Sequence, residues 1–280
     1  MKCLLSIPAI VAAVLAVIAA AAPHASATTI GVTVADASTG NYTLTSVSVT
    51  RGAAGTFTYV PSQLIGVDLT DVDAFQTPLL VPNGSSLPAP GTRATLLEDG
   101  RVDTGVVNIT TTNGTPDRSV ELTFNTPVVN SAGEDLLLFE MGGDDPIRFW
   151  VNNNRNEPDS EDFSTATYSD NLLTGVPFSL ISYNNSGDQD INSLAELESD
   201  VGFTAPVAGS GNLRALGVDL SLLGVPAGES ISSIRFQTIA GAGRVDPVMV
   251  AGLPAVPEPT GSTCLIAAAV VAAVRRRRLH

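Results

Sequence analysis

Val120-Glu-Leu-Thr-Phe124 is the stretch that most clearly decides the fold. Its apolar residues, Val120, Leu122 and Phe124, recur at every second position. Because successive side chains of an extended strand point to opposite faces, these three share one face and the polar residues between them share the other. The stretch therefore predicts a half-buried β-strand.

Other stretches repeat this pattern or have the composition of strands. Ile234-Arg-Phe-Gln-Thr238 alternates in the same way, and the segments Thr45–Thr50 and Gly105–Thr111 are rich in Thr and Val. Leu136-Leu-Leu-Phe139 and Val248-Met-Val-Ala251 are short and continuously apolar. We expect these two to be strands that are buried on both faces.

Turn signals separate the predicted strands at short intervals, as at Asn83-Gly84, Asp99-Gly100, Asn113-Gly114 and Ser186-Gly187. Many short strands with frequent Gly, Asn and Asp turns predict an all-β fold, specifically a single β-sandwich of jelly-roll type. One short helix is expected at Ser193-Leu-Ala-Glu196, whose spacing is that of a capping box.

The N-terminus has the three parts of a secretory signal peptide: the basic Lys2, the apolar run Leu4–Ala22 and the small-residue site Ala25-Ser26-Ala27. We expect the signal peptide to be cleaved after Ala27, where Ala25 and Ala27 are the small residues of the cleavage site. We prefer this interpretation to an uncleaved N-terminal anchor. The predicted organisation is a signal peptide at 1–27, one β-sandwich domain at 28–255 and a C-terminal segment at 256–280. The alternative is two domains, joined by the linker-like segment Pro82–Pro90.

The C-terminal segment also has three parts in a fixed order. Two prolines bracket a Glu in Val256, Pro257, Glu258 and Pro259, a combination that neither continues a helix nor joins a central strand. The apolar run Cys264–Val274 follows, and it is short beside the roughly 20 residues of a spanning helix. The end is basic and resists translocation, through Arg275, Arg276, Arg277 and Arg278. The order predicts a short transmembrane helix with its Pro-Glu-Pro joint on the outer side.

This tail resembles the C-terminal sorting signal of the PEP-CTERM proteins of Gram-negative bacteria. The resemblance implies that the tail is a temporary membrane anchor, cut near Pro257–Pro259 by an exosortase-type membrane protease. It implies an exported protein, tethered to the membrane before processing and then at the cell surface or extracellular, with a structural or adhesive role in an exopolysaccharide layer. Phrases in the body, such as Glu134–Glu140 and Gly217–Glu229, are similar to phrases common in exported PEP-CTERM proteins of unassigned activity. A permanent single-pass anchor is the alternative interpretation of the tail.

Composition excludes several function classes. The chain carries a net charge of −14, and removing Lys2, Glu258 and the four C-terminal arginines leaves −18 on the body. Such a surface repels nucleic acid and anionic lipid. All His, Cys and Lys residues lie in the two removable ends, so the body lacks the base of a Ser-His-Asp or Cys-His nucleophile, the usual zinc ligands and a Schiff-base amine. We therefore expect a protein that is not an enzyme.

A calcium loop is the first candidate ligand site. Asp188, Asp190 and Asn192 place oxygen side chains at alternate positions, as in a Ca²⁺ loop. However, Ser193 stands where the sharp turn needs Gly, and Ser199 stands where the bidentate Glu is needed. We therefore favour a polar loop that leads into the capped helix, with Ca²⁺ binding as the alternative.

Trp150, the only Trp, is the second candidate. It lies between loops rich in carboxylates and amides, so one interpretation is a Ca²⁺-dependent carbohydrate-binding module with Trp150 stacked on a sugar. The simpler interpretation is that Phe149 or Trp150 fills the core, since neighbours on a strand point to opposite faces. A second alternative function is a glycoside hydrolase that uses a carboxylate pair such as Asp144 with Glu157.

Overall fold

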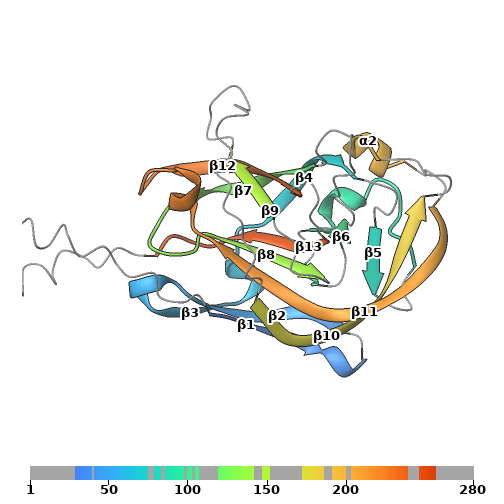
Figure 1. Ribbon diagram of the computed structural model, residues 1–280, viewed down its shortest axis with the longest axis horizontal. Helices are drawn as coiled ribbons and strands as arrows, with labels where there is room; N and C mark the ends of the chain where they lie inside the picture. The colour runs from blue at the N-terminus through green and yellow to red at the C-terminus, as the bar shows by residue number, and fades with distance from the viewer. Residues whose placement is uncertain are drawn as a thin grey trace, which may run out of the picture.

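The computed structural model is mostly β-sheet, with one short α-helix and three sheets in the part of the chain that it describes (Figure 1). It describes residues 29–39, 41–74, 79–82, 86–97, 100–102, 105–106, 119–141, 147–151, 172–185, 191–199, 203–238 and 246–256. The predicted mostly-β fold with a short helix is confirmed. The predicted signal peptide and sorting helix lie outside the described residues.

The N-terminal sheet has the order β1-β2-β3, with antiparallel neighbours. Its strands are β1 (Ile30–Asp36), β2 (Asn41–Thr50) and β3 (Thr56–Tyr59). Strand β2 contains the predicted stretch Thr45–Thr50. Its residues alternate in burial, so one face of this sheet packs inward and the other meets solvent.

The central sheet has the order β13-β8-β11-β10-β5-β6. Its strands are β5 (Leu79–Pro82), β6 (Gly105–Val106), β8 (Leu136–Met141), β10 (Leu172–Asn185), β11 (Phe203–Val218) and β13 (Pro247–Gly252). Of the predicted strand Gly105–Thr111, the first two residues form β6 and the others lie outside the described residues.

The four-stranded sheet has the order β4-β7-β12-β9. Its strands are β4 (Val67–Asp73), β7 (Ser119–Val129), β9 (Ile147–Val151) and β12 (Ser230–Thr238). The predicted alternation is confirmed in β7, where Val120, Leu122 and Phe124 are buried, and in β12, where Ile234 and Phe236 are buried.

The three sheets form layers that share two hydrophobic cores. The first core joins the four-stranded sheet, through residues such as Leu122 and Phe236, to Leu136 and Leu138 of the central sheet. The second core joins the N-terminal sheet to the opposite face of the central sheet. Figure 1 shows these layers as the blue strands β1–β3 below, β8 and β13 in the middle, and β7 and β12 above.

Strand β8 explains why the apolar runs are continuous. Leu136 and Leu138 belong to the first core, whereas Leu137, Phe139 and Met141 belong to the second. All six residues of β8 are buried, as are all six of β13. The prediction that these runs are strands buried on both faces is confirmed.

The predicted short helix is α2 (Leu194–Leu197), a single turn. The Ser193 hydroxyl accepts the Glu196 N–H (3.2 Å), as predicted, while the Glu196 carboxylate reaches back to the Asn192 N–H (2.8 Å). The remaining short helices are 3-10 turns: η1 (Ala37–Thr39), η2 (Gly52–Ala54), η3 (Pro61–Gln63), η4 (Arg93–Thr95) and η5 (Leu220–Leu223).

A reciprocal pair of caps fixes α2 to η4. The fully buried Arg93 donates through Nη1 to the carbonyls of Leu197 and Ser199, both at 2.6 Å, at the end of the helix. In return, the Glu198 carboxylate accepts the backbone N–H groups of Arg93 and Ala94 at the start of η4. Each side chain satisfies backbone groups that the other element leaves without a helical partner.

Candidate functional site

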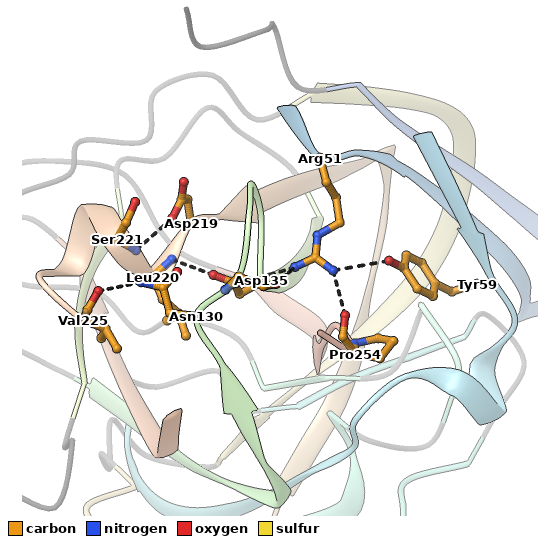
Figure 2. Close-up of polar contacts among 10 residues, drawn as sticks. Arg51, Tyr59, Asn130, Asp135, Asp219, Leu220, Ser221, Val225 and Pro254 are labelled. Atoms are coloured by element: carbon orange, nitrogen blue, oxygen red, sulfur yellow. Dashed lines mark hydrogen bonds and ion pairs between the residues drawn. The ribbon is translucent and has the colours of Figure 1, made fainter. Parts of the chain in front are cut away.

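The segment that follows β13, residues 253–256, is the first candidate site, and we call it the exit. Strand β13 ends at Gly252, and the next residue, Leu253, is fully buried and donates its N–H to the Asp135 carbonyl (2.7 Å). The Pro254 carbonyl accepts a hydrogen bond from Arg51 Nη1 (2.7 Å), as Figure 2 shows. Ala255 is exposed and Val256 is half-buried. Val256, the last residue that the structure describes here, immediately precedes the predicted Pro-Glu-Pro joint.

Arg51 is the residue that secures this exit. Its side chain and that of Asp135 are both 0% exposed, and Arg51 Nη2 lies 2.8 Å from Asp135 Oδ1. The same guanidinium donates to the Ser131 hydroxyl (2.7 Å) and, through Nη1, to the Tyr59 hydroxyl (3.4 Å). One cation therefore ties together the N-terminal sheet, the β7–β8 turn and the end of β13, which lies 203 residues along the chain.

Asp135 completes the network on its other side. Its Oδ1 accepts the Ser131 N–H (3.0 Å) and the Ser131 hydroxyl (2.9 Å), and its Oδ2 accepts the Leu220 N–H (3.2 Å). Burial raises the pKa of Asp135 from 3.8 to about 6, against the opposing effects of these hydrogen bonds and of the Arg51 charge. The arrangement is a buried ion pair whose hydrogen-bonding groups are supplied largely by turns.

The β11–β12 connection packs beside this ion pair. The Asp219 side chain accepts the Ser221 N–H (2.8 Å) at the start of η5, and Gly224 ends the turn in a left-handed conformation (φ 77°). The buried Asn130 donates its side-chain amide to the Val225 carbonyl (2.5 Å) (Figure 2). These caps hold the connection in one conformation next to the exit.

The beginning of the described chain lies at the same place. The Thr29 carbonyl accepts the Thr50 N–H (2.9 Å), and Thr50 is the residue before Arg51. The predicted signal-cleavage residues Ala25 and Ala27 lie outside the described residues. The first and last described parts of the body are thus held by two consecutive residues at the end of β2.

The outer face of the four-stranded sheet is the second candidate site. A single register row crosses its four strands, in which Asp71 lies opposite Glu121, Glu121 opposite Arg235, and Arg235 opposite Trp150. Arg235 Nη2 forms ion pairs with the Glu121 carboxylate and, at 3.6 Å, with Asp71 Oδ2. The three charged side chains are 26%, 23% and 48% exposed for Arg235, Glu121 and Asp71, so they lie on the face opposite the core.

A β-bulge in β4 places Asp71 in this row. The register shifts between Leu69 and Asp71, which leaves Thr70 as the extra residue. Leu69 remains in the first core, while both Thr70 and Asp71 have exposed surface. The bulge therefore brings a second carboxylate to the guanidinium of Arg235.

The structure separates the two aromatic residues considered for sugar binding. Phe149 is buried in the first core against Phe236, with ring centroids 6.0 Å apart. Position 150 follows it on β9 and is the register partner of Arg235. The interpretation that one of the two aromatics fills the core is confirmed for Phe149, and Trp150 stands in the charged row.

The predicted calcium loop is described only at its end. Asp188 and Asp190 lie outside the described residues, and Asn192 is exposed and donates its side-chain amide to the Glu196 carboxylate (3.4 Å). Within the described ranges, no group of three or more metal-ligating side chains is found. Ca²⁺ binding at this loop stays a prediction.

The other predicted site residues are not described by the structure. They are Pro257, Glu258, Pro259 and the arginines at 275–278 in the tail, and the carboxylate pair Asp144 and Glu157. In the part of the chain that the structure describes, no helix is long and apolar enough to cross a bilayer.

Compared with known proteins, the chain matches no family model, no curated protein and no solved structure.

Sequence reasoning missed the Arg51–Asp135 network. Its available signal was the placement of charge beside apolar runs: Arg51 directly follows the predicted strand 45–50, and Asp135 directly precedes the run Leu136–Phe139. A charged residue at the edge of a fully buried strand needs a partner of opposite charge. The signal could mark each residue as a candidate, but the two are 84 residues apart and only the fold pairs them.

Proposed function

We propose that this chain is an exported surface or matrix protein that is sorted and processed through its C-terminal tail. The observation that carries the proposal is the order Pro257-Glu-Pro259, apolar run, Arg275–Arg278. In this proposal the arginines stop the tail in the membrane, and an exosortase-type membrane protease cuts near Val256–Pro259. The released body then has a structural or adhesive role in an exopolysaccharide layer.

The geometry of the exit supports a cut at this position. Pro254 is held by Arg51, so only two residues, Ala255 and Val256, lie between this hydrogen-bonded residue and Pro257. A cut there removes no strand of either core, because β13 already ends at Gly252. The body would keep its ion pair and both cores after processing.

We also propose how the three sheets build the predicted sandwich. We infer that the central sheet and the four-stranded sheet are the two halves of the predicted jelly-roll-like sandwich, since they share the first core. The N-terminal sheet then adds a third layer through the second core. The signal peptide at 1–27 and the sorting segment at 256–280 flank this body.

Mass spectrometry of both ends of the protein isolated from its native host tests the proposal. We expect an N-terminus at Thr28 and a C-terminus between Val256 and Pro259. A matched variant with Arg275–Arg278 replaced by Ala should lose the membrane stop and leave the tail uncut. An intact tail to His280 in the surface protein would restore the permanent anchor.

Carbohydrate binding is the second candidate, and the register row on the four-stranded sheet favours it. A guanidinium and two carboxylates lie partly exposed on this sheet, in one register row with an aromatic residue, and these are groups that can recognise a sugar through hydroxyl hydrogen bonds and stacking. A glycan array with Trp150→Ala and Arg235→Met tests this site, with Val60→Ala as a control on an exposed residue that follows β3 of the N-terminal sheet. Equal glycan binding by all three variants would exclude the row of Asp71, Glu121, Arg235 and Trp150 as the sugar-binding site.

Ca²⁺ and hydrolysis remain separate alternatives. Melting with Ca²⁺ against a chelator tests the loop of Asp188, Asp190 and Asn192, and an unchanged melting temperature removes the metal. A glycoside hydrolase predicts a bell-shaped pH profile on some polysaccharide. Inactivity across a broad panel would count against it.

A further inference from the structure

Strand β13 begins at an Asp-Pro peptide bond. The chain contains two such bonds, Asp145-Pro146 and Asp246-Pro247, and the second lies within the described residues. An Asp carboxyl can attack the carbonyl carbon of its own peptide bond and close a small anhydride ring, because carboxylates are competent nucleophiles. The nitrogen that then leaves is that of a tertiary amide, and it is released as a basic secondary amine. An Asp-Pro bond is therefore chemically predisposed to break from within.

Strand β8 holds the carbonyl of the second Asp-Pro bond. Glu140 and Pro247 are register partners, but because Pro247 has no N–H they cannot exchange a pair of hydrogen bonds. The bond at this point runs instead from the Met141 N–H to the Asp246 carbonyl (3.1 Å). A backbone N–H aimed at this oxygen stabilises the negative charge that develops on it when a nucleophile attacks the carbonyl carbon.

A β-bulge sets the orientation of Pro247. The register of β13 shifts between Pro247 and Met249, which leaves Val248 as the extra residue. Val248 and Met249 consequently both lie in the second core, whereas Val250 lies in the first. Pro247 is buried and precedes this pair, so its ring lies on the side of the first core.

Glu140 brings a carboxylate to the same side. It follows Phe139 of the second core, so its side chain lies on the face of Leu138, toward the first core. The residue is 1% exposed, and its register partner on the other neighbouring strand is Arg214 of β11. Directly opposite residues have Cβ atoms roughly 4.5–5.5 Å apart, so Glu140 stands beside Pro247. A nitrogen that becomes a buried ammonium at Pro247 needs a carboxylate in this position.

We propose that the Asp246–Pro247 bond is a self-cleavage site, with Asp246 as nucleophile, the Met141 N–H as oxyanion donor and Glu140 as counter-ion of the released nitrogen. A carboxyl oxygen of Asp246 bonds to the carbonyl carbon of the same residue, the carboxyl proton passes to the Pro247 nitrogen, and the C–N bond breaks. The products are a cyclic anhydride at Asp246 and a proline amine. Asp246 is half-buried, so water reaches the anhydride and opens it to two carboxyl groups. The net reaction is the hydrolysis of one peptide bond and consumes one water.

The cut would leave β13 in its place. The hydrogen bonds that hold this segment to Leu97, Ile65, Asp135 and Arg51 all lie beyond the cut, at Val250, Gly252, Leu253 and Pro254. The piece that begins at Pro247 would therefore stay attached through a buried strand instead of a peptide bond. The inference does not rest on the proposed tail processing, because the bond lies before the exit and its chemistry uses only residues of the body.

Incubation of the purified full chain at pH 5, folded and in urea, tests the proposal, with mass spectrometry of the denatured products. We expect fragments that end at Asp246 and begin at Pro247 to form at least about ten-fold faster in the folded chain than in urea, because only the fold supplies the donor and the counter-ion. Asp145-Pro146 is the internal control, since it is the same dipeptide. In urea both bonds should be cut at similar low rates, and in the folded chain the cut at 246 should dominate.

Two variants assign the roles. Asp246→Glu keeps the charge, but its longer side chain must close a larger ring, so we expect the cut in the folded chain to fall to the rate in urea. Glu140→Gln keeps the shape and removes the counter-ion. We expect it to slow the cut several-fold in the folded chain, with folding verified by near-UV circular dichroism, and to leave the rate in urea unchanged.

Each contrary result overturns part or all of the proposal. Cutting at 246 that is no faster in the folded chain than in urea, or equal cutting of the two Asp-Pro bonds in the folded chain, overturns the site. Undiminished cutting in Asp246→Glu assigns the cleavage to a contaminating protease and overturns it as well. An unchanged rate in Glu140→Gln overturns the counter-ion role.

Discussion

Replacing Arg51 by Met is expected to destabilise the body by about 3–5 kcal/mol at pH 7. Met has a similar length and fills the space, so the substitution removes chiefly the charge and its four hydrogen bonds. Asp135 would then be a buried carboxylate without its cation. For a body of this size, a loss of this magnitude lowers Tm by roughly 6–20 °C.

The pH dependence follows from the pKa of Asp135, which burial raises from 3.8 to about 6. Because the folded state binds this proton more readily than the unfolded chain does, the group makes the native body more stable as pH falls through 6. The gain is complete once pH is below 3.8, and from pH 7 to pH 5 it amounts to about 1 kcal/mol. In Arg51→Met the pKa rises further, because the charge that lowers it is gone. The deficit of the variant should therefore be smaller at pH 5 than at pH 7.

Urea denaturation of the purified protein at both pH values measures these quantities. Arg235→Met is the matched control, since it removes an Arg that is 26% exposed and whose two ion pairs lie on the sheet surface. We expect a loss of less than about 1 kcal/mol for it. A loss of stability below about 1 kcal/mol in Arg51→Met would refute the stabilising role of the buried ion pair. A loss that is the same at pH 5 and pH 7 would refute the effect of Arg51 on the pKa of Asp135.

Three further substitutions test local features. Gly133→Ala places a Cβ 2.7 Å from the backbone of Arg51 at a position with φ of +79°, so unfolding midpoints should show a loss of about 2–4 kcal/mol; an unchanged midpoint would contradict the close approach. Ser193→Ala removes the cap of α2 and should cost about 1 kcal/mol, with faster hydrogen exchange at the Glu196 amide; unchanged exchange would exclude the cap. Glu198→Ala leaves two backbone amides of η4 without their acceptor and should cost about 1–3 kcal/mol in a thermal melt, whereas Glu198→Gln keeps one acceptor and should cost less; equal losses would argue against capping.

The strands were predictable because their burial is periodic in the sequence. Val120, Leu122 and Phe124 face one core at spacing two, and Leu136–Phe139 is apolar throughout because its side chains enter two cores alternately. The same run does not say which sheets supply those cores. A side-chain pattern records burial on each face, but it does not name the neighbouring strand.

The third layer illustrates this limit. Strands β1–β3 alternate like any half-buried sheet, and nothing local distinguishes packing against the back of the central sheet from membership in a two-sheet sandwich. The helix was predicted from its cap at Ser193, yet its length was not. It ends after one turn, where the guanidinium of Arg93 binds its last carbonyls from a distant segment.

For the candidate sites, too, the sequence indicates single residues but not the residues that the fold brings beside them. Trp150 was singled out by composition, but its row with Arg235, Glu121 and Asp71 depends on the register of four strands and on a one-residue bulge in β4. The exit network depends on a contact between residues 51 and 254, which no sequence spacing encodes.

The attachment of β13 determines how the body would bear tension on its tail. A pull beyond Pro254 acts along the axis of β13, so its hydrogen bonds to β8 are loaded in shear and share the force. On the other edge of β13, Gly252 exchanges two hydrogen bonds with Ile65, both at 2.8 Å, and the Val250 N–H binds the Leu97 carbonyl (3.1 Å). The Arg51–Pro254 contact is the first to feel the load and passes part of it into the N-terminal sheet. Once the Arg51–Pro254 contact opens, the ladder hydrogen bonds of β13 must break together, so the strand resists extraction as a unit.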